Sequence, residues 1–150
     1  MTDLDDGQID RASLTAVSGW RSGQDSLIVT PSGGITVTYD ATLGSLTLVG
    51  PAPTGDFETV LRSIRFHNPS EAPTAGTRAF EFAADDGTGD GPVASRSVIL
   101  TAVNDAPVAL NDSAEILQGA WVAVDVLGND TDVDGGYLRI GGWDPLADAT

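Results

Sequence analysis

The sequence contains no cysteine and no lysine, and His67 is its single histidine. Without cysteine the chain can form neither disulfide bonds nor thiolate metal sites, and it offers no thiol nucleophile. One histidine is also too few for a zinc site built on imidazole ligands. Any metal that this protein binds would therefore be held through oxygen atoms, as calcium is.

Long apolar runs are also absent, and the first twenty residues show no basic stretch followed by an apolar one. A membrane-spanning helix needs about 20 consecutive apolar residues, and a secretory signal needs the basic and apolar stretches in that order. We therefore expect no membrane insertion, and any secretion signal would lie outside these residues.

Negative charge dominates what is present. The formal net charge is −15, 18 of the 22 acidic residues are aspartate, and the seven basic residues are all arginine. A field of this sign repels nucleic-acid phosphates and anionic lipids, so we expect no nucleic-acid partner. Aspartate gathered in loops is typical of calcium ligands, although an acidic surface that only keeps a protein soluble has the same composition.

Apolar residues alternate with period two in short runs, and 18 glycines and eight prolines separate these runs. Such alternation predicts strands, and about seven strands in about 100 residues favour an antiparallel Greek-key β-sandwich of cadherin or Ig type. The predicted strands are residues 12–18, 26–29, 35–39, 45–49, 63–67, 78–84 and 93–103. The fold class is therefore all-β.

One short helix interrupts the strands. Phe57, Val60 and Leu61 recur at helical spacing within residues 54–62. Thr54 is the expected N-cap, because threonine side chains accept hydrogen bonds from the first turn of a helix. We expect this helix to close one end of the sandwich.

The composition changes near residue 104. Residues 1–103 hold 13 acidic residues and six arginines, whereas residues 104–150 hold nine acidic residues and one arginine. Pro107 follows an Asn-Asp-Ala sequence there and suits a stiff junction, because proline fixes its backbone angle φ. We therefore predict a sandwich repeat at 1–103 and, at 104–150, a junction with the N-terminal part of the next repeat.

The second part is short of strands. Its strand-like runs are residues 114–117, 121–127 and 138–140, which are too few for an independent sandwich.

An internal repeat links the two parts. Residues 2–9 align with residues 131–138 at a constant offset of 129, and a Gly-Trp pair follows each stretch at 19–20 and at 142–143. Repetition at a fixed spacing is typical of tandem arrays. We infer that the chain visits the same structural position twice.

Acidic residues gather in several short clusters along the sequence. Residues 129–135 place oxygen-bearing side chains at alternate positions before a glycine, which resembles the first half of an EF-hand loop. The EF-hand interpretation is rejected, because the glutamate near the twelfth position and the flanking helices are missing. Turn formation alone is the competing explanation, since Asp-Gly and Asn-Asp pairs are common in turns. The candidate ligands are Asp3, Asp5, Asp6, Asp85, Asp86, Asn104, Asp105, Asp130, Asp132 and Asp134.

Two of these motifs resemble a known family. Residues 103–108 are similar to the junction signature of cadherin-like repeats, and residues 126–135 are similar to the Asn-Asp-x-Asp-x-Asp-Gly stretch of such repeats in large bacterial (RTX-type) surface adhesins. The resemblance extends over nearly the whole chain. It departs from animal cadherins at Ala106, where their fuller Asp-x-Asn-Asp-Asn motif ends in asparagine, and at Val103, where an acidic ligand would stand.

The resemblance implies a calcium-binding structural repeat on the bacterial cell surface, secreted and serving adhesion. It places Asp85, Asp86, Asn104 and Asp105 at one junction, and it places the aspartates of residues 130–134 in the neighbouring loop. The partners it implies are neighbouring repeats of the same polypeptide, together with cell-surface or matrix components.

Other functions stay open at this point. Trp20, Trp121 and Trp143 could stack on sugar rings in a calcium-dependent carbohydrate-binding module, although packing in the core or at the junction is the preferred use. We expect no enzymatic activity on another molecule, because the acids lie in turns. Self-cleavage at the Asp144-Pro145 bond is a narrower alternative to an ordinary turn.

The first and second parts have complementary deficits. By the repeat alignment, strands within residues 106–127 correspond to the opening strands that would precede the first acidic cluster, at residues 3–6. They could fold back onto the first sandwich, join another molecule in a head-to-tail assembly, or remain partly disordered.

Overall fold

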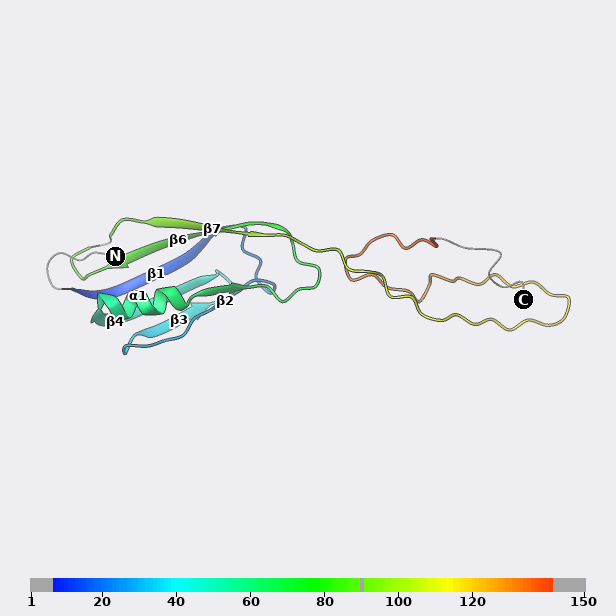
Figure 1. Ribbon diagram of the computed structural model, residues 1–150, viewed down its shortest axis with the longest axis horizontal. Coiled ribbons are helices and arrows are strands. Elements are labelled where there is room, and N and C mark those ends of the chain that lie inside the picture. Colours follow the sequence, from blue (N-terminus) through cyan, green and yellow to red (C-terminus); the bar gives the residue numbers. More distant parts are fainter. Residues whose placement is uncertain (1–6, 90, 142–150) are drawn as a thin grey trace. The chain divides into compact units, whose positions relative to one another are not determined.

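The structure is a computed structural model that describes residues 7–89 and 91–141 (Figure 1). The chain divides into two compact units, Met1–Ala102 and Val103–Thr150. Every named strand and the helix belong to the first unit.

The first unit is built on a five-stranded antiparallel sheet with the order β3-β4-β1-β6-β7. Consecutive strands form the hairpins β3–β4 and β6–β7. Strand β1 lies between the two hairpins and pairs with β4 and β6, which are distant from it in the sequence (Figure 1). The strands are β1 (Gln8–Ser18), β3 (Thr36–Asp40), β4 (Ser45–Pro53), β6 (Gly76–Asp85) and β7 (Ala94–Leu100).

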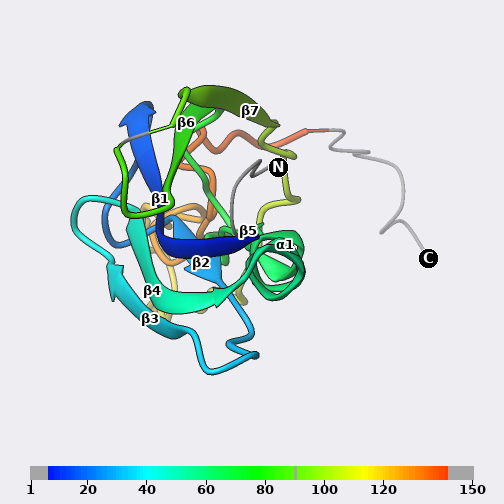
Figure 2. The same ribbon diagram turned by 90° about the vertical axis from the view of Figure 1, so that its left-hand side faces the viewer.

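A second, shorter sheet pairs β2 (Ser26–Ile28) with β5 (Arg65–His67). In the end-on view, the five-stranded sheet curves around β2, β5 and the helix α1 (Thr54–Ser63) (Figure 2). The strand predictions for this unit are confirmed, and the all-β sandwich with one short helix is the observed fold class.

Helix α1 forms where the sequence predicts it and buries its apolar stripe. Phe57 and Val60 are fully buried against the sheet. The expected N-cap is wrong, because Pro53 occupies that position and Thr54 is the first helical residue. The backbone N–H and the hydroxyl of Thr54 each donate to the carbonyl of Gly7 at 3.0 Å. The start of the helix is therefore anchored to the start of β1.

Alternate residues of the strands fill the core between the two layers. Leu14 of β1 and both Leu46 and Leu48 of β4 are almost completely buried, as period-two alternation requires. Burying a leucine side chain stabilises a fold by about 1.5–3 kcal/mol, so these side chains supply much of the driving force for folding.

An aromatic cluster closes one end of this core. Trp20 packs edge-on against Phe66 and Phe80, with ring centroids 6.5 and 6.3 Å apart, and its Nε1 donates to the carbonyl of Ala41 at 3.1 Å. Gly44 has a φ of +64°, and a Cβ there would stand 2.4 Å from the Trp20 ring. The prediction that Trp20 packs in the core is confirmed.

The second unit contains no strand in the part that the structure describes. Among its residues up to 141, one isolated bridge joins Val108 and Thr131 in antiparallel orientation. The strands predicted at 114–117, 121–127 and 138–140 are therefore wrong. Apolar alternation forms a strand only when a neighbouring strand takes its hydrogen bonds and a second layer covers its apolar face.

The exposure of the side chains in these runs shows that no second layer covers them. Leu117 is 83% exposed and Trp121 is 98% exposed, so the predicted core or junction packing of Trp121 is wrong as well. Trp143 and the Asp144-Pro145 bond lie outside the described residues.

Candidate functional site

Within the second unit, residues 104–111 lie antiparallel to residues 129–134. Val108 and Thr131 exchange two backbone hydrogen bonds of 2.8 and 3.1 Å. On one side of this pair, Asp130 Oδ1 accepts from the backbone N–H of Leu110 at 2.8 Å. On the other side, Asp134 Oδ2 accepts from the backbone N–H of Asp105 at 2.6 Å. Two acidic side chains therefore hold the pairing together.

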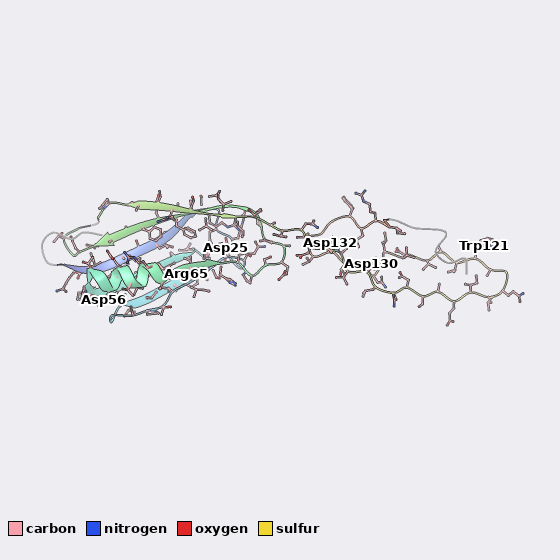
Figure 3. The ribbon with its side chains drawn as sticks, in the orientation of Figure 1. Asp25, Asp56, Arg65, Trp121, Asp130 and Asp132 are labelled. Carbon is pink, nitrogen blue, oxygen red and sulfur yellow. The ribbon has the colours of Figure 1, made fainter. Side chains whose placement is uncertain are left out.

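The aspartates at 130, 132 and 134 belong to this segment. All three are half-buried, whereas Thr131, Val133 and Gly135 between and after them are exposed. Asp130 and Asp134 both reach the 104–111 segment, while Val133 and Asp134 lie in a turn. Figure 3 shows Asp130 and Asp132 in this unit. The second unit therefore shields three carboxylates partly from solvent.

The segment then turns at Gly135. Asp132 Oδ1 accepts from the N–H of Asp134 at 2.9 Å, and the N–H of Gly135 donates to the Asp132 carbonyl at 3.1 Å. Gly135 has a φ of +75°, which glycine adopts without strain. Both the aspartate spacing and the glycine noted in the sequence are thus used locally to make a turn.

These residues fit a calcium ion in their donor chemistry but not in their geometry. Carboxylate oxygens are the hard ligands that calcium prefers, so the donor chemistry fits. The geometry does not, because no three His, Asp or Glu side chains of residues 7–89 and 91–141 are grouped so as to hold a metal ion. One oxygen each of Asp130, Asp132 and Asp134 accepts a backbone N–H instead.

Two further candidate ligands, Asp85 and Asp86, lie in the first unit. At the end of β6, Asp85 Oδ1 accepts from the N–H of Gly87 at 2.8 Å. Asp86 Oδ1 accepts from the N–H and hydroxyl of Thr88 at 2.9 and 2.6 Å. Both aspartates therefore stabilise the turn that leaves β6.

In the second unit, Asn104 Nδ2 donates to the Asp105 carbonyl at 2.7 Å. The structure brings Asp105 to Asp134, two residues that the resemblance placed in different sites. Asp3, Asp5 and Asp6 lie outside the described residues.

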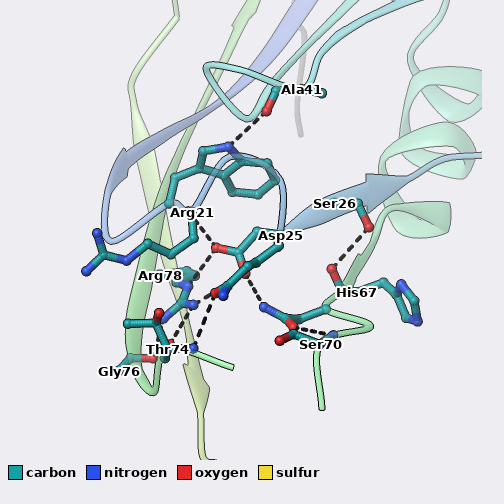
Figure 4. Close-up of polar contacts among 12 residues, drawn as sticks. Arg21, Asp25, Ser26, Ala41, His67, Ser70, Thr74, Gly76 and Arg78 are labelled. Carbon is teal, nitrogen blue, oxygen red and sulfur yellow. Dashed lines mark hydrogen bonds and ion pairs between the residues drawn. The ribbon is translucent and has the colours of Figure 1, made fainter. Parts of the chain in front are cut away.

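A buried ion pair in the first unit was missed by the sequence analysis. Arg78 is 1% exposed and Asp25 is 4% exposed, and Arg78 Nε lies 2.8 Å from Asp25 Oδ2 (Figure 4). Asp25 also accepts from Asn68 Nδ2 at 2.7 Å and from the N–H of Arg21 at 2.8 Å, while Arg78 Nη2 donates to the Thr74 carbonyl at 2.8 Å.

These contacts determine the charge state of the pair. Burial alone would raise the pKa of the Asp25 carboxyl, but the hydrogen bonds from Arg78, Asn68 and Arg21 and the charge of Arg78 outweigh it. The pKa of Asp25 therefore lies below its ordinary value, and the carboxylate stays ionised.

The pair joins two loops, the one before β2 and the one between β5 and β6, to the sheet. Asp25 belongs to the loop before β2, whereas Arg78 lies on β6 and also reaches the Gly76 carbonyl at 3.3 Å. A signal for it was visible in the sequence, because Arg78 takes an inward position in the alternation that continues with Phe80 and Phe82. A charge at such a position indicates a buried partner, since an unpaired buried charge is very costly.

Comparisons with known proteins add one match. The family model of a bacterial Ig domain matches residues 104–149. No curated protein and no solved structure matches the chain. No helix among the described residues is long and apolar enough to cross a membrane. The segment that follows the β-sandwich unit is therefore similar to an Ig-like repeat.

Proposed function

We propose that this chain is a structural module from a tandem array of Ig-like domains on a bacterial cell surface, where it serves adhesion. The observation that carries the proposal is the position of the bacterial Ig match. It begins at residue 104, four residues after β7 ends at Leu100. A sandwich followed at once by an Ig-like segment is the arrangement expected of a repeat array, whose units are mostly structural.

We further propose that calcium stiffens the second unit. The support is that Asp130, Asp132 and Asp134 are all half-buried, with the backbone N–H of Asp105 bonded to Asp134. Carboxylates on one short segment repel one another, and a bound divalent cation would neutralise and crosslink them. Since no three of them are grouped around one point, binding would have to draw these side chains together.

A calcium-dependent carbohydrate-binding module is the second candidate. Trp121 favours it, because a tryptophan that is 98% exposed offers a stacking surface for a sugar ring. Trp20 counts against it, because this ring packs against Phe66 and Phe80. Titration of sugars monitored by tryptophan fluorescence would separate the candidates, since only a sugar platform gives a saturable change that Trp121→Ala removes.

The calcium proposal is tested by thermal unfolding of the whole chain in calcium and in EDTA. A ligand that binds only the folded state stabilises it by about 2.7 kcal/mol when present at 100 times its Kd. We expect calcium to raise the melting temperature of the second unit, and Asp132→Ala and Asp134→Ala to lower the calcium affinity.

Asp40→Ala is the matched control for these variants. Asp40 Oδ1 only caps the β3–β4 turn, through the N–H groups of Thr42 and Leu43 at 2.8 and 3.0 Å. This variant should leave calcium affinity unchanged. Identical unfolding curves in calcium and in EDTA would overturn the calcium proposal.

A further inference from the structure

Three neighbouring strands of the first unit, β1, β6 and β7, run between opposite ends of its larger sheet. Strand β6 lies between β1 and β7 and is antiparallel to both, so β1 and β7 run parallel to each other (Figure 1). The chain follows β1 from Gln8 to Ser18 and later follows β7 from Ala94 to Leu100. It therefore enters β1 at one end of the sheet and leaves β7 at the opposite end.

The register gives the size of this separation. Arg11 of β1 pairs with Asp85 of β6. Ile99 of β7 pairs with Thr77, which lies eight residues from Asp85 along β6. At about 3.3 Å per residue this is about 26 Å along the strands, whereas two strand spacings separate β1 from β7 by about 10 Å. A pull between Arg11 and Ile99 is therefore directed mainly along the strands.

Such a pull acts on the sheet in shear. The hydrogen bonds between antiparallel strands lie perpendicular to the strands, so a force along the strands acts on all bonds of a ladder together. The β1–β6 and β6–β7 ladders each join seven residue pairs. A force directed across the strands would instead separate one pair after another. The first unit therefore presents its most resistant direction to a pull between its two ends.

The buried ion pair joins two of the same strands. Asp25 belongs to the loop that follows β1, and its Oδ2 lies 2.8 Å from Nε of Arg78 on β6 (Figure 4). The same oxygen accepts from the N–H of Arg21, three residues after β1 ends, at 2.8 Å. Sliding β1 past β6 toward its own N-terminus would draw Asp25 away from Arg78. Breaking a buried pair is costly, because each charge is left buried without its partner.

The chain between β1 and Asp25 also lies directly against β6. Gly19 follows the last residue of β1 and has a φ of +76°, and a Cβ there would clash with the carbonyl oxygen of Thr77. Glycine permits both this backbone conformation and this close approach. The end of β1 is therefore held at the start of β6, beside Arg78.

We propose that β1, β6, β7 and the Asp25–Arg78 pair form a mechanical clamp, with which the first unit resists tension between its two ends. The source of that tension is the proposed tandem array, so this inference rests on the proposed function. A further strand of the polypeptide that joined the sheet would add hydrogen bonds and leave the shear direction unchanged. The clamp adds a function, resistance to force, to the structural role of the unit.

Single-molecule pulling of the full chain in an optical trap compares two directions of force. The sequence has no cysteine, so pairs of introduced thiols can carry the DNA handles at chosen points. Arg11→Cys with Ile99→Cys applies force along the strands, and Thr77→Cys with Ile99→Cys applies it across one pair of the β6–β7 hairpin. All three side chains are exposed, so these substitutions leave the core intact.

At one loading rate, the pull along the strands should need a several-fold higher unfolding force than the pull across the hairpin. The hydrogen bonds break together in the first direction and in succession in the second. Equal forces in the two directions would overturn the proposal.

The part played by the ion pair is tested with two destabilised variants. Asp25→Asn removes the charge but keeps the size of the side chain, whereas Val60→Ala removes buried contacts of α1, outside the clamp. Urea unfolding measures the stability that each variant loses, and pulling between residues 11 and 99 measures the force that it loses. Forced unfolding follows the unfolding rate, which rises only when the lost contact is one that breaks before the transition state.

Asp25→Asn should therefore lose more force per unit of lost stability than Val60→Ala. An equal or smaller loss for Asp25→Asn would contradict the clamp. Pulling in EDTA keeps the result separate from the other proposals, because the handles and the ion pair belong to the first unit and the calcium proposal concerns the second. A failure of the clamp would leave the array and calcium proposals standing, and a failure of the calcium proposal would leave the force difference unchanged.

Discussion

The two units show what apolar alternation can and cannot specify. In the first unit, alternating residues face a second layer, and 11 apolar side chains are buried in one core. In the second unit, comparable alternation at 121–127 gives no strand, and none of its described residues is buried. A period-two pattern therefore predicts which residues could share a face, while the presence of an opposing layer decides whether the strand forms.

The units also differ in the charges that they shield from solvent. The first unit places one carboxylate, Asp25, in its interior and matches it with Arg78. The second unit half-buries Asp130, Asp132 and Asp134, and the one basic residue among its described residues is Arg139, which is exposed. The first unit therefore supplies its own counter-charge, whereas for the second unit we propose a bound cation.

The largest expected loss of stability comes from removing the buried ion pair of the first unit. Asp25→Ala leaves Arg78 buried without its partner, and such a change costs about 3–5 kcal/mol. Urea unfolding should show this loss for the first unit. Arg62→Ala is the control, because Arg62 pairs with Glu58 at 3.1 Å on the surface and such exposed pairs contribute less than about 1 kcal/mol. Equal losses in the two variants would contradict the role given to Asp25.

A matched pair of leucine truncations sharpens the comparison between the units. Leu48→Ala removes a fully buried side chain and should cost about 2–5 kcal/mol, because it leaves a cavity in the core. Leu117→Ala removes a side chain that is 83% exposed and should stay within about 0.5 kcal/mol. Denaturant midpoints with equal m-values would measure both. A large effect at Leu117 would show that the second unit has a core of its own.

A smaller effect concerns pH. The pKa of Asp25 is lowered in the folded state from its ordinary value of 3.8. The ionised carboxylate therefore stabilises the first unit at pH values above that ordinary pKa. This contribution should disappear as the pH falls through the still lower pKa of the folded state. We expect the stability difference between wild type and Asp25→Asn to be constant from pH 7 to about pH 5 and to shrink below the ordinary value. A difference that stays constant down to the acid transition would contradict the assignment.

Much of the first unit could be predicted from the sequence, because its signals are local. The stripe of Phe57, Val60 and Leu61 indicated α1, and alternation between glycines indicated the strands. The pairing of Asp25 with Arg78 was missed, since the partners are 53 positions apart and only the fold brings them together.

The candidate site divides in the same way. The sequence places aspartates at alternate positions over 130–134 before a glycine, and in the structure all three are half-buried beside a turn. The bond from the N–H of Asp105 to Asp134 joins residues 29 positions apart, which no local pattern indicates. The strands predicted in the second unit failed because their formation depends on a partner surface and not on their own sequence.

Hydrogen exchange, resolved along the chain by mass spectrometry, tests the central claim most directly. Protection against exchange reports local opening, so it follows each unit separately in one sample. If the first unit is self-sufficient and calcium orders the second, adding calcium should slow exchange in peptides covering residues 104–138 and leave those covering β4 and β6 unchanged. Unchanged exchange in residues 104–138, or slowing that is equal throughout the chain, would contradict the account.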